Sequence, residues 1–143
     1  MITLAQQPPA VTPMTPEMNP AYNFTRPDAD FIRKQVMIAM RDGAKLFTVI
    51  AMKKGVRNAP ILLTHTVYNA SRATSRRPSQ RLVDILPVMD AEFVNDGYIR
   101  VYQDARGRNN SEDEFVMNRP IIGTLNKTTV DESTDAYDTT TGS

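Results

Sequence analysis

The chain has 143 residues, of which 41% are hydrophobic and 23% charged, a composition typical of a folded globular domain rather than a disordered or fibrous chain. The formal net charge of +1 gives no long-range attraction for nucleic acid or an anionic membrane, so neither is expected as a partner. With no cysteine, a disulfide framework, a thiolate metal site and a cysteine nucleophile are excluded.

Proline dominates the first part of the chain. Proline at this density withholds backbone donors and opposes helix formation, which predicts a flexible leader over residues 1–30 and a folded part over residues 31–143. Leu4-Ala5-Gln6 resembles the end of an export signal, so a periplasmic or secreted location is slightly favoured over a cytoplasmic one. No apolar run approaches the roughly 18 residues that a membrane-spanning helix needs.

Two strand-like runs open the folded part. Residues 36–40 are apolar throughout, and residues 45–52 form a second strand candidate. Between them, Asp42-Gly43 supplies the positive-φ residue that a tight turn favours. The pattern predicts an antiparallel hairpin.

A βαβ unit is predicted next. The short apolar run 61–66 is typical of a strand buried on both faces, and 98–102 is a second strand rich in β-branched and aromatic residues. Between them lie a polar segment, 69–81, and apolar positions at helical spacing over 82–97, which Pro87 divides into two helical pieces. The fold class is therefore α/β, an antiparallel hairpin followed by the first parallel βαβ unit of an incomplete sheet.

The remaining residues, 103–143, are polar and predicted to be irregular. If they were helical, Asp131, Asp135 and Asp138 would share one face, which is more often solvated than a cation site. Asp104 and Glu114 could in principle form a two-carboxylate glycosidase pair, but carboxylate pairs are common in acidic loops. No metal or other cofactor is predicted.

Nucleophilic catalysis lacks its essential parts in these residues. No serine stands in the G-x-S-x-G context of an exposed strand-to-helix turn. The single histidine, His65, lies inside a predicted strand and is interpreted as a packed or hydrogen-bonded residue rather than a general base. The arginine-rich stretch within 69–81 is interpreted as a solvated loop, because no aromatic residues are interleaved.

Several stretches carry a family resemblance. Residues 36–46 read V-M-I-A-M-R-D-G-A-K-L, residues 64–70 read T-H-T-V-Y-N-A, and residues 93–104 read F-V-N-D-G-Y-I-R-V-Y-Q-D. Together with residues 117–120, 125–126 and 131–139, they resemble, in the same order, motifs of the α-amino acid ester hydrolases. These enzymes belong to a wider α/β-hydrolase family with cocaine esterase and the X-prolyl dipeptidyl peptidases.

The resemblance implies a serine hydrolase that acts on esters or amides of α-amino acids, including β-lactam-type acyl groups, by hydrolysis or acyl transfer. Tyr68 matches the tyrosine whose hydroxyl is implied to contribute to the oxyanion hole. His65 and Val67 replace the arginine and proline of the T-R-T-P-Y motif, and Asp113 replaces the glycine of an S-E-G segment. That last exchange puts the turn in doubt if it needs a positive φ.

The nucleophile elbow of the family would follow the last matched motif. We therefore expect an N-terminal portion of the catalytic domain that has no nucleophile, base or acid of its own and no esterase activity alone. The expected partner of the full-length relative is a small-molecule ester or amide. The alternative is a non-catalytic module that retains the sheet edge for protein interaction, and such an edge is also compatible with a homo-oligomer.

Overall fold

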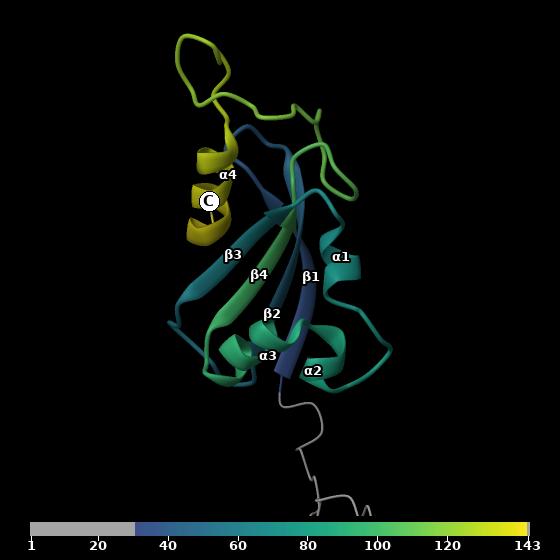
Figure 1. The fold of residues 1–143 in the computed structure, drawn as a ribbon. Coiled ribbons are helices and arrows are strands. Elements are labelled where there is room, and N and C mark those ends of the chain that lie inside the picture. Colours follow the sequence, from purple (N-terminus) through teal and green to yellow (C-terminus); the bar gives the residue numbers. More distant parts are fainter. Residues whose placement is uncertain (1–30, 143) are drawn as a thin grey trace, which may run out of the picture.

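A computed structural model describes residues 31–142, and the proline-rich leader predicted over residues 1–30 lies outside that range. The strands are β1 (Phe31–Ala39), β2 (Lys45–Lys53), β3 (Ile61–Thr66) and β4 (Ile99–Asp104). The helices are α1 (Ala70–Ala73), α2 (Leu82–Ile85), α3 (Val88–Asn95) and α4 (Glu132–Thr141). The strands form one sheet in the order β1-β2-β4-β3 (Figure 1).

The predicted hairpin is confirmed. β1 and β2 pair antiparallel, with Ala39 opposite Lys45 next to the turn. Gly43 adopts φ +90° and donates its N–H to the carbonyl of Met40 at 2.8 Å, which closes the turn. β1 begins at Phe31, before the apolar run that signalled it, because its first residues pair along the full length of β2.

The predicted parallel unit is confirmed as well. β3 and β4 pair in parallel, from Ile61 opposite Ile99 to Thr66 opposite Asp104. β4 also pairs antiparallel with β2, so the sheet is mixed. The prediction that residues 61–66 are buried on both faces is wrong: β3 lies at the sheet edge, where Ile61 is exposed and the other residues are half-buried. An edge strand has a neighbour on one side only, which leaves its side chains less covered.

One face of the sheet carries α1, α2 and α3 (Figure 1). Pro87 precedes α3 and separates it from α2, as the sequence predicted. The four-residue helix α1 lies within the polar segment 69–81, for which the sequence predicted no helix. The buried core of this layer comprises Val49, Ala51, Ala70, Leu82, Ile85, Leu86, Ala91, Val94 and Tyr102.

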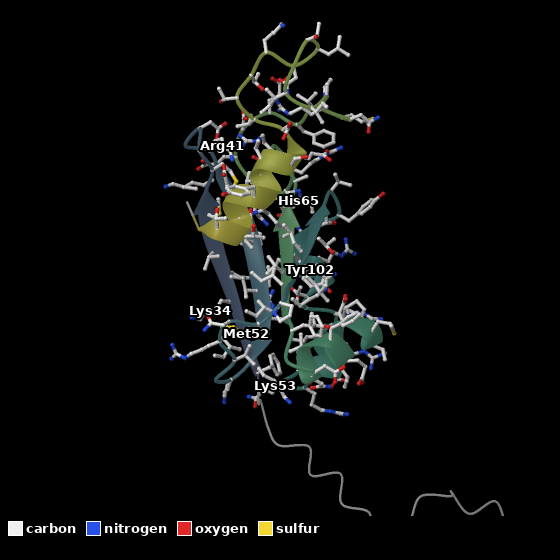
Figure 2. All side chains as sticks on the ribbon, turned by 90° about the vertical axis from the view of Figure 1, so that its left-hand side faces the viewer. Lys34, Arg41, Met52, Lys53, His65 and Tyr102 are labelled. Carbon is white, nitrogen blue, oxygen red and sulfur yellow. The ribbon has the colours of Figure 1, made fainter. Side chains whose placement is uncertain are left out.

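The other face carries α4, and its contacts are polar (Figure 2). Thr139 donates its hydroxyl to Gln103 Oε1 at 3.0 Å, and Gln103 Nε2 donates to Thr48 Oγ1 at 2.9 Å. Asp131 caps the helix by accepting the N–H of Thr134 at 2.8 Å. The prediction of an irregular chain beyond residue 103 is therefore wrong for α4.

The acidic face of α4 is buried. The expectation that Asp131, Asp135 and Asp138 form a solvated face is therefore wrong. Asp135 and Asp138 are only 4% and 2% exposed. Asp138 pairs with Arg41 at 2.7 Å and Asp135 with Arg106 at 2.6 Å. Arginines from the hairpin turn and from the segment after β4 compensate the charge that would otherwise keep this face in water. Within residues 31–142, no helix is both long and apolar enough to cross a membrane.

Candidate functional site at the carboxyl ends of β3 and β4

The carboxyl ends of the two parallel strands lie side by side. Thr66, the last residue of β3, is in register with Asp104, the last residue of β4. Ligand sites of open α/β sheets form outside the carboxyl ends of such strands. Tyr68 stands in the loop that leaves β3 at this edge, and 84% of its surface is exposed.

The loop turns sharply from β3 into α1. The Tyr68 N–H donates to Thr66 Oγ1 at 3.0 Å. Asn69 adopts φ +75°, a conformation that asparagine tolerates better than most residues, and its side chain accepts the N–H of Arg72 at 3.0 Å. This local chemistry ends the strand, begins the helix and leaves the Tyr68 side chain pointing into solvent.

The side chain of Asp104 holds the loop between β3 and α1 in place. Its carboxylate is fully buried and accepts the N–H of Ala70 at 2.6 Å and that of Asn110 at 3.2 Å. Asn109 donates its side-chain N–H to the carbonyl of Val67 at 3.2 Å, so the loop is held on both sides of Tyr68. A carboxylate occupied by backbone donors in this way does not fit a two-carboxylate glycosidase pair with Glu114.

A pocket of about 140 Å³ lies beside this loop, and Val67, His65 and Phe115 are among the residues that line it. His65 is half-buried on β3, near α4 in Figure 2, as the interpretation of a packed strand residue requires. Its Nε2 is buried and has no hydrogen-bond partner among the described residues. Burial lowers the pKa of His65 below its ordinary value, although Asp135 and Glu132 oppose the shift, so the imidazole is neutral at pH 7.

Arg106 also lines this pocket. Its guanidinium contacts the carboxylates of Asp42 at 2.7 Å, Asp113 at 2.9 Å and Asp135 at 2.6 Å. These bonds, that to Asp135 above all, raise the pKa of Arg106. Within residues 31–142, no group of three or more histidine, aspartate or glutamate side chains is arranged to hold a metal ion.

Asp113 occupies the turn that the sequence placed in doubt. It adopts φ +76°, so this position does require the left-handed conformation. Aspartate tolerates that conformation, and its carboxylate adds the ion pair with Arg106, which lowers the pKa of Asp113. The exchange of glycine for aspartate is thus compatible with the turn.

Sequence reasoning found Tyr68 but missed the residues that hold its surroundings in place. The sequence analysis placed Asp104 in a motif and in a glycosidase pair and gave Arg106 no role, although both residues closely follow a predicted strand. The arginine stretch is solvated as expected at Arg72, Arg76 and Arg77, which are exposed.

Known proteins share both the sequence motifs and the fold of this chain. The family model of the X-Pro dipeptidyl-peptidase (S15 family) matches residues 42–141. An α-amino acid ester hydrolase structure is 50% identical with a TM-score of 0.72, over 90% of this chain and 21% of that one. An aminopeptidase structure from the marine sediment archaeon Thaumarchaeota archaeon is 44% identical with a TM-score of 0.71, over 86% of this chain and 20% of that one.

The chain thus spans about a fifth of the length of the two solved structures. Its four-stranded mixed sheet matches the N-terminal part of an α/β-hydrolase. No curated protein sequence matches the chain at a significant level.

Proposed function

Because the chain belongs to the X-Pro dipeptidyl-peptidase (S15) family, we propose that it supplies the oxyanion-hole side of a serine hydrolase that acts on α-amino acid esters and amides. In this proposal Tyr68 donates its phenolic hydroxyl to the oxyanion of the tetrahedral intermediate. One observation carries it: Tyr68 is exposed at the carboxyl end of β3, on a loop that Asp104 and Asn109 hold in place.

The chemistry requires such a donor at this edge. When a serine hydroxyl attacks the carbonyl carbon, its proton passes to a histidine and the carbonyl electron pair moves to the oxygen. A preorganised donor stabilises the charge that develops there, and α/β-hydrolases supply one from the loop after this strand. A phenol on a fixed loop can donate without a costly rearrangement.

His65 has no part in this mechanism. Its position within β3 and its contact with the pocket beside α4 favour a packing role. None of the 143 residues is assigned as nucleophile or general base, because no serine stands in a G-x-S-x-G context and the single histidine is packed within β3. The substrate class is supported by the names of the two matched structures, an α-amino acid ester hydrolase and an aminopeptidase.

A chimera tests the proposal. Residues 31–142 replace the matching segment of the 50% identical α-amino acid ester hydrolase, and the product is assayed with a p-nitrophenyl ester of an α-amino acid. We expect hydrolysis that a serine-directed inhibitor abolishes, and a preference for the free-amino ester over its N-acetylated counterpart. A folded chimera without activity would contradict the proposal, and a lost preference would contradict the substrate class.

We further propose that the 143-residue chain alone has no esterase activity, since it contains no G-x-S-x-G serine. The purified chain is incubated with the same ester, with and without the serine-directed inhibitor. Turnover that the inhibitor abolishes would show a nucleophile within the chain and refute this part of the proposal.

A second candidate function is favoured by the edge strand. Among residues 31–142, β3 has a strand neighbour on one side only, and Ile61 is exposed on it. Exposed backbone donors and acceptors on such a strand can pair with another chain, which fits a non-catalytic interaction module or a homo-oligomer. Size-exclusion chromatography and thermal unfolding separate the cases: a soluble monomer that unfolds cooperatively favours an autonomous module, whereas aggregates favour part of a larger enzyme.

A further inference from the structure

A second and larger pocket lies away from the strand ends. It has a volume of about 500 Å³ and lies between the first residues of β1 and the loop that joins α1 to α2. This volume is within the range of small-molecule sites, about 300–1,000 Å³. Its apolar walls come from Phe31, Pro78 and Ile85, and its polar groups include Arg33, Thr74 and Arg77.

Arg33 brings an uncompensated positive charge to this pocket. Its side chain points to the helical layer, where Nε donates to the carbonyl of Thr74 at 3.1 Å and Nη2 donates to Thr74 Oγ1 at 3.0 Å. The partners are neutral, and none of the ion pairs among residues 31–142 includes Arg33. Burial lowers the pKa of Arg33, which shows that its surroundings disfavour the cation.

The loop opposite Arg33 adds further positive charge. Arg77 lines the pocket, is exposed, and takes part in none of the ion pairs of the described residues. The nearby acid, Asp84, accepts the hydroxyl of Ser79 at 2.8 Å and lies 3.8 Å from Arg81. Its carboxylate therefore meets the pocket only through Ser79, and Arg81 offsets its charge.

Arg33 still has donors to offer. Its Nη1 carries two N–H groups, of which one can reach the Gln35 amide oxygen at 3.2 Å. The other has no partner among the described residues. A guanidinium can bind a carboxylate through charge-assisted hydrogen bonds, and the apolar walls favour a ligand with a hydrocarbon body over a small inorganic ion.

We propose that this pocket binds a small organic carboxylate, with Arg33 and Arg77 contacting the carboxylate and Phe31, Pro78 and Ile85 contacting its apolar body. The site is separate from Tyr68 and does not depend on the proposed hydrolase function. It accounts for a half-buried arginine without an acid and for a basic loop that the candidate functional site leaves unused.

The test is a titration of the ¹⁵N-labelled full chain with 3-phenylpropionate, followed by NMR. We expect saturable shifts around residues 31–33 and 74–80. The dissociation constant of the neutral 3-phenylpropionamide should be at least about tenfold higher, because the amide lacks the charge that the arginines recognise. Inorganic phosphate, which has no apolar body, should also bind more weakly than the carboxylate.

Variants make the test specific. Arg77→Gln is an exposed substitution that leaves the bonds of Arg33 to Thr74 intact, and it should weaken binding of 3-phenylpropionate by about tenfold. Arg57→Gln, equally exposed but outside the pocket, should leave binding unchanged. Arg33→Lys keeps the positive charge and should bind better than Arg33→Gln. Equal binding of acid and amide, no effect of Arg77→Gln, or no saturable shifts at the pocket would each overturn the proposal.

Discussion

At the scale of single residues, Asp104 supports the loop that carries Tyr68. Its buried carboxylate accepts the N–H groups of Ala70, the first residue of α1, and of Asn110, in the segment after β4. A buried amide without an acceptor costs about 1–3 kcal/mol. Loss of this carboxylate should therefore loosen the point at which the loop enters α1.

We predict that Asp104→Ala accelerates hydrogen exchange of the Ala70 and Asn110 amides by at least about tenfold, because both lose their acceptor. Exchange in the centre of β2 should change much less. Asp96→Ala, an exposed position after α3, serves as the control. An Ala70 amide that exchanges as slowly as in the unaltered chain would contradict the role assigned to Asp104.

Several aspartates make stability depend on pH. Hydrogen bonds to Arg106 lower the pKa of Asp113, and hydrogen bonds to Arg41 lower that of Asp138. Backbone amides, first that of Ile122, lower the pKa of Asp131. Because the folded-state pKa of each group lies below its unfolded value, the stabilisation is complete above the unfolded pKa of about 4 and is lost as the pH falls through the folded pKa.

The melting temperature should accordingly fall slightly from about pH 7 to 5, because the lowered pKa of the half-buried His65 makes its protonation unfavourable in the folded chain. It should fall more steeply below about pH 4, where the aspartates are protonated. Calorimetry across this range measures it. The Asp113→Asn variant, which keeps the left-handed position but not the charge, should show a smaller fall. A melting temperature that is the same at pH 5 and pH 3 would be incompatible with these lowered pKa values.

At the scale of elements, Arg106 joins three parts of the chain. Asp42 lies in the turn of the hairpin, Asp113 in the loop after β4, and Asp135 in α4. The Arg106 side chain is 5% exposed and that of Asp135 is 6% exposed, so neither has ready access to water. Removing the cation would leave buried negative charge without a partner.

Arg106→Met should therefore lower the free energy of unfolding by on the order of 3 kcal/mol, measured by urea denaturation. The double variant Arg106→Met/Asp135→Asn should recover part of this loss, since the buried carboxylate is then neutral. Arg57→Met, at an exposed position, should change stability little. A loss below about 0.5 kcal/mol for Arg106→Met would show that the cluster does not hold α4 on the sheet.

Two glycines differ in what an added side chain would meet: backbone strain alone at one, and a steric clash as well at the other. Gly97 and Gly107 both have positive φ, at +94° and +70°. A Cβ atom at Gly97 would meet open space, whereas one at Gly107 would clash with the backbone of Phe115. Phe115 lines the pocket beside the Tyr68 loop, so crowding at Gly107 displaces that wall.

Gly97→Ala should cost about 1 kcal/mol from backbone strain alone. Gly107→Ala should cost several times as much and shift the NMR signals of residues 105–115, because the clash is with backbone that cannot rotate away. Equal destabilisation by the two variants would contradict the close packing of this loop.

At the scale of the whole molecule, the sequence predicted the turns, breaks and strands that neighbouring residues determine. Asp42-Gly43 marked the hairpin turn, Pro87 marked the break between α2 and α3, and runs 61–66 and 98–102 marked the parallel strands. These features depend on residues close together in the chain. The resemblance to the hydrolase family then indicated the α/β-hydrolase fold, which the comparison confirms, and Tyr68 as a candidate, which remains a prediction.

Features that depend on distant partners were missed. α4 has no apolar stripe, because its buried residues Asp135 and Asp138 pair with Arg106 and Arg41 rather than with hydrocarbon. A search for hydrophobic periodicity cannot detect a helix that packs through ion pairs. The role of Asp104 was hidden for the same reason, since its partner Ala70 lies on a different element.

The kcat of Tyr68→Phe in the chimera with the α-amino acid ester hydrolase tests the central claim most directly. The substitution removes only the hydroxyl, at a position where 84% of the residue is exposed, so the fold should be unaffected. We predict that kcat falls on the order of 10²–10³-fold with little change in KM, the loss typical of one oxyanion donor. Tyr137→Phe, an exposed tyrosine on α4, should leave kcat unchanged. A Tyr68→Phe chimera with unaltered kcat would contradict the assignment of Tyr68 to the oxyanion hole.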